Sequence, residues 1–244
     1  MAKHKVDIFI PCFIDQMFPE TAFNMVKVLE SLDCEVFYNP DQTCCGQPAY
    51  NAGYFEDARE VASKLLNEFN KPDRFIVTPS GSCGGMLKNG FTSLFKQTPN
   101  LHQCRVMQKN VFEFTQFLTE VLKVEHIPHS KLGGLAVYHD ACSALRELKI
   151  KEGPRKLLSN VEGLELIEAA DCESCCGFGG TFSVKFEPIS VAMAEQKIES
   201  ALALNASYII STDTSCLMHM DGYIQKKKLP IQAMHIADVL ANGW

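Results

Sequence analysis

Eleven cysteines in a chain of 244 residues are the side chains best suited to chemistry in this sequence. Thiolates bind metals and carry out redox reactions, but a free cysteine can also be a small buried hydrophobe, so the spacing must decide. The odd number and the lack of a secretion signal argue against a disulfide framework. The cysteines therefore indicate a metal or redox site, provided that they are grouped.

Eight of the cysteines form two sets with nearly the same spacing, offset by about 130 residues. Each set has a lone cysteine, then a Cys-Cys-Gly sequence, then a cysteine that follows a serine. The sets are Cys12, Cys44, Cys45 and Cys83 in the first half, and Cys142, Cys175, Cys176 and Cys216 in the second. Two sets with the same order and spacing indicate an internal duplication.

Strand and helix patterns alternate along both halves. Short apolar segments predict strands at 6–10, 35–38, 75–77, 135–139, 164–167 and 208–211. Apolar stripes with a helical period predict helices at 19–32, 54–70, near 153–160 and at 188–203. This alternation predicts an α/β fold of two pseudo-repeated Rossmann-like lobes with mostly parallel sheets. We expect the lobes to span residues 1–124 and 125–244, joined by the stretch 124–134.

All eight cysteines of the two sets follow predicted strands, which places the cysteine loops at the carboxyl ends of the strands. Ligands of open α/β sheets bind outside those ends, so four sulfurs from three loops can converge in each lobe. A helix begins after each loop, and its N-terminus favours a negatively charged thiolate–metal cluster. The sequence thus predicts that sulfur-rich sites carry whatever chemistry the chain performs.

These motifs resemble the CCG (cysteine-rich domain) family of iron–sulfur proteins, in which such a pattern usually occurs twice. The family includes the cysteine-rich subunit of heterodisulfide reductase, the glycolate oxidase iron–sulfur subunit and the lactate utilisation proteins of type A. The stretches 44–49, 79–83, 139–142 and 175–182 are most similar to the lactate utilisation branch. The resemblance covers nearly the whole chain.

The resemblance implies that the eight cysteines bind one or two iron–sulfur clusters. A fifth cysteine of the family pattern is replaced by Met86 in the first lobe and by His219 in the second. That replacement argues against the five-cysteine non-cubane cluster of heterodisulfide reductase and favours an ordinary [4Fe–4S] cluster on four thiolates. With His219 as a metal ligand, the second lobe could instead bind zinc.

Five further residues have open assignments. His139 follows a predicted strand and could be a proton carrier, a hydrogen-bond donor to a metal ligand, or a hydrogen-bonded structural histidine. Cys172 could add a ligand to the second site or be a plain loop cysteine. Cys34 and Cys104 match neither set and are expected to be structural, and His235 is expected to be a cap or core residue.

The resemblance implies an iron–sulfur electron-transfer component of an L-lactate (2-hydroxy acid) oxidation system. Such a chain would be a subunit of a multi-component oxidoreductase of the L-lactate dehydrogenase type, with no catalytic residues of its own. Its partner would be a ferredoxin-type iron–sulfur subunit. Two alternatives remain: a zinc-stabilised or thiol-regulated binding protein without redox turnover, and a thiol–disulfide oxidoreductase similar to heterodisulfide reductase.

Composition excludes several other classes of protein. A hydrophobic fraction of 46% is typical of a folded chain, and a net charge of −6 argues against binding nucleic acid. The longest apolar stretch, residues 8–14, is too short for a transmembrane segment. We expect a cytoplasmic protein whose association with the inner face of the membrane, if any, is made through partners.

Overall fold

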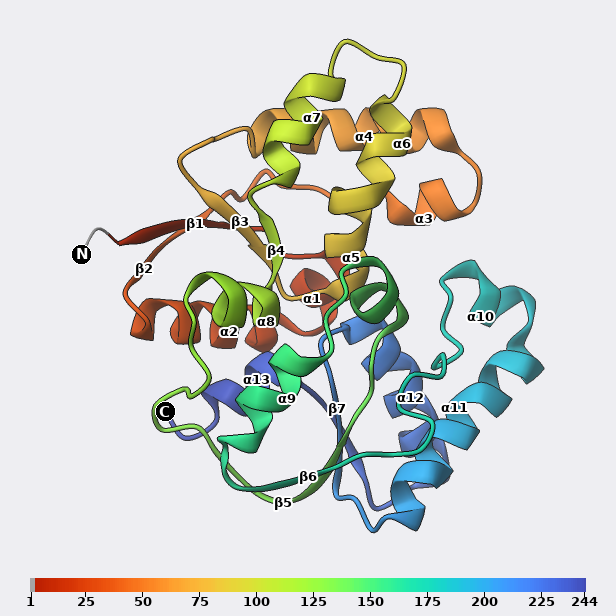
Figure 1. Cartoon of the computed structure of the whole chain (residues 1–244). Helices are drawn as coiled ribbons and strands as arrows, with labels where there is room; N and C mark the ends of the chain where they lie inside the picture. Colours follow the sequence, from red (N-terminus) through yellow and green to blue (C-terminus); the bar gives the residue numbers. More distant parts are fainter. Residues whose placement is uncertain (1–2) are drawn as a thin grey trace.

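The computed structural model describes residues 3–244, which form two four-stranded sheets (Figure 1). The strand order is β2-β1-β3-β4 in the first sheet and β6-β5-β7-β8 in the second. All neighbouring strands are parallel. The same order in both halves confirms the predicted α/β fold of two pseudo-repeated lobes.

The strands follow the six predicted segments closely and add two more. The first sheet contains His4–Ile8 (β1), Cys34–Tyr38 (β2), Phe75–Thr78 (β3) and Val111–Glu113 (β4). The second contains Lys131–Tyr138 (β5), Glu162–Ile167 (β6), Tyr208–Ser211 (β7) and Gln232–His235 (β8). The edge strands β4 and β8 were not expected, and β5 begins inside the stretch expected to join the lobes. The boundary at residue 124 stays a prediction.

Helices connect the strands in both halves. In the first half they are Cys12–Met17 (α1), Pro19–Ser31 (α2), Gln47–Asn51 (α3), Phe55–Glu68 (α4), Gly81–Gly85 (α5), Phe91–Phe95 (α6), Leu101–Gln108 (α7) and Phe114–Gln116 (α8). In the second half they are Glu152–Ser159 (α9), Thr181–Lys185 (α10), Glu187–Ala203 (α11), Thr214–Lys227 (α12) and Ile236–Ala241 (α13). Three π-helical turns are Met86–Gly90 (η1), Phe117–Val121 (η2) and Ser143–Glu147 (η3).

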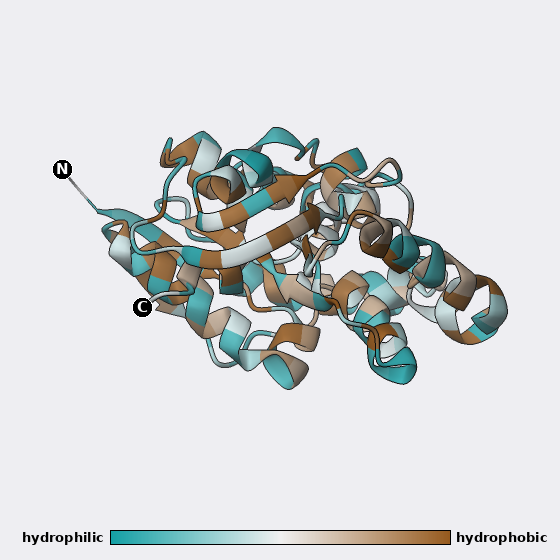
Figure 2. Cartoon of the chain, turned by 90° about the horizontal axis from the view of Figure 1, so that it is seen from below, coloured by the Kyte–Doolittle hydropathy of each residue, from teal (hydrophilic) through white to brown (hydrophobic). Residues whose placement is uncertain are grey.

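The hydrophobic core has three layers because each sheet is covered on both faces. Helices α2, α8, α9 and α13 lie between the two sheets (Figure 1), where Leu29, Leu157 and Leu240 pack together. Helices α4, α6 and α7 cover the far face of the first sheet, and α11 and α12 cover that of the second. Figure 2 shows hydrophobic residues along the strands and hydrophilic ones on outward helical turns. The shared middle layer joins the lobes, which keeps the carboxyl ends of both sheets in a fixed relation.

Candidate metal centres

The four cysteines of the first set lie together at the carboxyl end of the first sheet. Cys12 begins α1 after β1, Cys83 lies in α5 after β3, and Cys44 and Cys45 lie in the loop after β2. The Sγ atoms of Cys45 and Cys83 are 3.3 Å apart. The side chain of Cys44 contacts those of Cys12 and Cys45, which completes the group. Four sulfurs from three βα loops thus share one place.

The second set repeats this arrangement at the end of the second sheet. The side chain of Cys175 contacts those of Cys142 and Cys176, and Cys176 in turn contacts Cys216. Cys216 lies in the first turn of α12, as Cys83 lies in α5. Both groups therefore present four convergent sulfur donors, a set that suits an iron–sulfur cluster or a zinc ion. The role of the eight cysteines as ligands stays a prediction.

Each group holds one sulfur with a strongly lowered pKa. The thiol of Cys12 hydrogen-bonds to the sulfur of Cys44 and lowers its pKa to about 2, and Cys142 does the same for Cys175. The amides of Gly46 and Gly177 add N–H donors, each 3.4 Å from the sulfur. The same contacts raise the pKa of Cys12, Cys45, Cys142 and Cys176, which keeps these four thiols protonated. Metal binding would release these protons, because thiolates are the metal ligands.

Cysteines outside the two sets have different surroundings. Burial raises the pKa of Cys34 and of Cys104 to about 11, as expected for structural thiols. Burial also raises the pKa of Cys172. The carbonyl of Cys172 accepts hydrogen bonds from the Asp140 amide at 3.1 Å and from Lys197 Nζ at 3.2 Å. Cys172 thus anchors its loop through its backbone.

The two residues at the fifth position of the family pattern lie differently. Met86 is 2% exposed and packs in the outer core of the first lobe beside Cys45 and Cys83. His219 Nε2 lies 3.1 Å from Ser190 Oγ and 3.2 Å from the Ser190 carbonyl oxygen. That nitrogen is therefore directed to α11, and the predicted ligand role of His219 is untested.

A different histidine lies against the sulfurs of the second lobe. One ring nitrogen of His139 and the Sγ atoms of Cys176 and Cys216 all lie within 4.8 Å of one another. Burial, helped by the charge of the buried Lys197, lowers the pKa of His139 to about 3, so its ring is neutral. The sequence left His139 with three possible roles because no local pattern shows which way a strand-end side chain points. A signal was available in the sequence: when the two halves are aligned, His139 in the second half corresponds to Phe9 in the first.

Polar contacts connect the lobes beside both sulfur groups. The Asp213 carboxylate accepts a hydrogen bond from the Ser82 amide at 2.7 Å, and His235 Nε2 lies 3.1 Å from the Pro79 carbonyl oxygen. His235 also accepts from the amide of Ala237 and so caps α13, which is one of its two expected roles. These contacts fix the loop before Cys83 against the loop before Cys216.

Glu113 is a fully buried acid at the interface between the lobes. We expect its ionisation to make the stability of the protein depend on pH. Desolvation raises its pKa to about 7, although hydrogen bonds from Thr115 and Thr212 oppose the shift. The folded chain therefore binds a proton that the unfolded chain releases near pH 4.5, and stability falls as the pH rises from about 4.5 to 7. The full effect is at most about 3 kcal/mol.

We expect Glu113→Gln to remove this slope, because glutamine does not ionise. Chemical denaturation at several pH values from 4 to 8 gives the unfolding free energy of wild type and variant, and the difference between the two pH dependences is the contribution of Glu113. Glu60→Gln on α4, where the side chain is exposed, is the matched control and should leave the slope unchanged. Identical slopes for wild type and Glu113→Gln would contradict the assignment.

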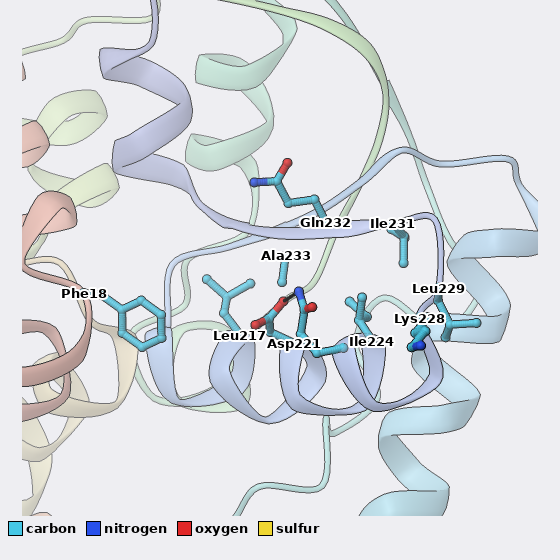
Figure 3. Close-up of a pocket in the computed structure, with 10 residues that line it drawn as sticks. Phe18, Leu217, Asp221, Ile224, Lys228, Leu229, Ile231, Gln232 and Ala233 are labelled. Atoms are coloured by element: carbon cyan, nitrogen blue, oxygen red, sulfur yellow. Dashed lines mark hydrogen bonds between the residues drawn. The ribbon is translucent and has the colours of Figure 1, made fainter.

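A separate pocket of about 400 Å³ lies between α12 and β8 (Figure 3). Phe18, Leu217, Ile224 and Ile231 supply its apolar wall, and Asp221 and Lys228 lie at its polar rim. Its lining contains no cysteine or histidine among the residues that the structure describes. The pocket is therefore distinct from the two sulfur groups.

A four-sulfur group at the end of each of two parallel sheets defines a duplicated cysteine-rich α/β protein. The sequence pattern of the CCG cysteine-rich domain matches residues 6–88 and 136–221, so the chain belongs to that family and carries its domain twice. No helix within residues 3–244 is long and apolar enough to cross a membrane.

Within the family, the chain is similar to proteins named Lactate utilization protein A. It is 44% identical over 237 residues to that of Geobacillus thermodenitrificans, covering 97% of this chain and 98% of the relative. It is 42% identical over 240 residues to Lactate utilization protein A 2 of Bacillus cereus strain Q1, covering 98% of each. Among solved structures, glutamate racemase from Francisella tularensis matches with a TM-score of 0.35 and 12% sequence identity, and the match covers 99% of this chain and 79% of the racemase. This similarity is too low to support a conclusion about function.

Proposed function

We propose that the chain is the iron–sulfur electron-transfer component of a system that oxidises L-lactate or a related 2-hydroxy acid. The observation that carries the proposal is the convergence of four cysteines at the end of each sheet. The relatives named Lactate utilization protein A supply the substrate class. A ferredoxin-type iron–sulfur subunit is the proposed partner.

The donor chemistry fits such a cofactor. Cys12, Cys44, Cys45 and Cys83 would hold it in the first lobe, and Cys142, Cys175, Cys176 and Cys216 in the second. A cluster bound there supplies one-electron transfer, with a potential set by ligands, burial and N–H···S hydrogen bonds. The amides of Gly46 and Gly177 already donate to sulfur and would tune that potential.

The position of the two groups suits a relay between partners. Cys45 and Cys176 are buried, whereas Cys12 is exposed, so the first group reaches the surface on one side. Phe13, next to Cys12, packs edge-on against Phe178 of the second cysteine loop at 5.8 Å. Helix α1, which begins at Cys12, thus touches the second cysteine loop, and this contact between the lobes would suit passage of an electron from one to the other.

Metal analysis of paired variants tests the proposal. Anaerobically prepared wild type should contain iron and acid-labile sulfide. The variants Cys45→Ser and Cys176→Ser should each lose the iron and sulfide that are bound in their own lobe. Cys104→Ser, which changes a buried structural thiol, is the matched control and should keep full iron. Full iron in both Cys45→Ser and Cys176→Ser would show that these cysteines are not ligands.

A zinc-stabilised protein without redox turnover is the second candidate. The 3.3 Å between the sulfurs of Cys45 and Cys83 favours it, because four thiolates around one ion with bonds of about 2.3 Å lie close together. The same preparations decide between the two. Zinc with no iron, even after anaerobic incubation with iron and sulfide, would replace the electron-transfer proposal with this one.

A further inference from the structure

A further difference between the two lobes, besides that of Met86 and His219, lies at the strand end beside the sulfurs. Register places Phe9 and His139 at equivalent points, since each is the first residue after its strand. The amide of Phe9 donates to the Val77 carbonyl at 2.9 Å, and the amide of His139 donates to the Ile210 carbonyl at 2.8 Å. The duplicated fold therefore carries a phenyl ring in one lobe where it carries an imidazole in the other.

The surroundings of the two rings differ accordingly. Phe9 is fully buried and packs edge-on against Phe69, with ring centroids 5.8 Å apart. His139 is 1% exposed, and neither of its ring nitrogens has a hydrogen-bond partner among residues 3–244. An unpaired buried polar group destabilises the folded state, and such groups are rare in folded proteins. The imidazole thus requires a partner, and the sulfurs of Cys176 and Cys216 lie within 4.8 Å of one of its nitrogens.

We propose that His139 is a ligand of the metal centre in the second lobe, where it binds alongside Cys176 and Cys216 and takes the place of one of the other two thiolates of that set, Cys142 or Cys175. The inference rests on the proposed function, because it assumes that this lobe holds an iron–sulfur centre. A neutral imidazole nitrogen binds iron as well as zinc, and it would also satisfy the buried ring. The two lobes then hold different centres: the first has thiolate donors only, and the second has thiolates and an imidazole.

His219 is the competing histidine, and its contacts assign it another role. Its Nε2 is occupied by the hydroxyl and carbonyl of Ser190. The Ser190 hydroxyl donates in turn to the Gly177 carbonyl at 2.8 Å. His219 therefore braces the Cys-Cys-Gly loop against α11, whereas His139 faces the sulfurs directly.

The difference between the lobes has a consequence for electron flow. An imidazole ligand in place of a thiolate removes negative charge from a centre and raises its reduction potential. The second centre is therefore expected to have the higher potential, so that electrons pass from the first lobe to the second. Replacing His139 with cysteine should lower the midpoint potential of the second centre and leave that of the first unchanged.

Electron–nuclear double resonance on protein labelled with ¹⁵N-histidine tests the ligand directly. The Cys45→Ser background removes the first centre, and the protein is loaded anaerobically with iron and sulfide and then reduced. We expect the strong nitrogen coupling of a metal-bound imidazole, lost in His139→Gln and kept in His219→Gln. A strong coupling that survives His139→Gln, or that disappears only in His219→Gln, would overturn the proposal.

Iron content keeps this test separate from that of the proposed function. If His139→Gln loses its second-lobe iron, His139→Cys decides: restored iron supports coordination, and iron still absent refutes it. Full iron in the parent protein with no strong nitrogen coupling refutes the His139 ligand and leaves the proposed function intact. Wild type without iron in either lobe defeats the proposed function itself.

Discussion

Replacing Gly177 with alanine is expected to lower the free energy of unfolding by about 2–5 kcal/mol and to remove metal from the second lobe. Gly177 has a φ of +94°, which an L-amino acid adopts at a cost of about 1–2 kcal/mol. A Cβ atom there would also lie 2.5 Å from the Ser190 carbonyl oxygen. Because the obstacle is helix backbone, the loop that carries Cys175 and Cys176 has to move.

Two other glycines separate the steric effect from the backbone strain. Gly53 has a φ of +86° and would have no atom within 4 Å of an added Cβ, so Gly53→Ala should cost only the strain of about 1–2 kcal/mol. Gly46, with a φ of +81°, would meet the Ala58 carbonyl oxygen at 3.1 Å and should give an intermediate loss. Chemical denaturation and iron content measure the series. Equal losses for Gly53→Ala and Gly177→Ala would show that the contact with α11 is unimportant.

The fold could largely be predicted from the sequence because its central strands are buried on both faces. The strands Phe75–Thr78 and Tyr208–Ser211 each begin with three apolar residues and lead into a cysteine loop, so their composition and their position agree. Two of the four edge strands, β4 and β8, escaped prediction because they are short and only two residues of each are apolar. Val111–Glu113 and Gln232–His235 end in the side chains that cap α8 and α13, and locally they cannot be told from loops.

The candidate site was only partly predictable, because the sequence shows the positions of its residues but not the directions of their side chains. The eight cysteines of the two sets could be identified because the duplication repeats their spacing. The order of the strands explains how loops far apart in the sequence meet at one end of each sheet. The histidines depend on packing that no local pattern shows. His219 lies three residues after Cys216 on α12, yet its direction is set by Ser190 on α11. His139 is singled out only when the register of the two sheets aligns it with Phe9.

Truncation of Arg155 should destabilise the second lobe by about 3–5 kcal/mol, because it leaves a buried carboxylate without its counter-charge. Arg155 on α9 binds both oxygens of Asp140, with Nη1–Oδ1 and Nη2–Oδ2 distances of 2.9 and 2.8 Å. The Asp140 side chain is 1% exposed. Asp140 follows His139 and lies two residues before Cys142, so the ion pair holds the loop that carries both.

The neighbouring residue on α9 gives a matched control for Arg155→Ala. Lys156 pairs with Glu125 at 2.9 Å, but both side chains are more than half exposed. Lys156→Ala should therefore change the unfolding free energy by less than about 1 kcal/mol. Arg155→Lys should fall between the two, because an ammonium group keeps the charge but cannot bind both carboxylate oxygens.

A double variant distinguishes loss of the ion pair from loss of packing. In Asp140→Asn with Arg155→Ala, no buried charge is left unpaired, so the double variant should be less destabilised than Arg155→Ala alone. Denaturation curves give the four free energies of this cycle, and second-lobe iron shows whether the loop has moved. Additive losses would mean that Arg155 acts through its contact with the Tyr138 ring, at 5.3 Å, rather than through Asp140. A smaller loss in the double variant, together with depleted second-lobe iron in Arg155→Ala, would tie the geometry of that metal site to one buried ion pair.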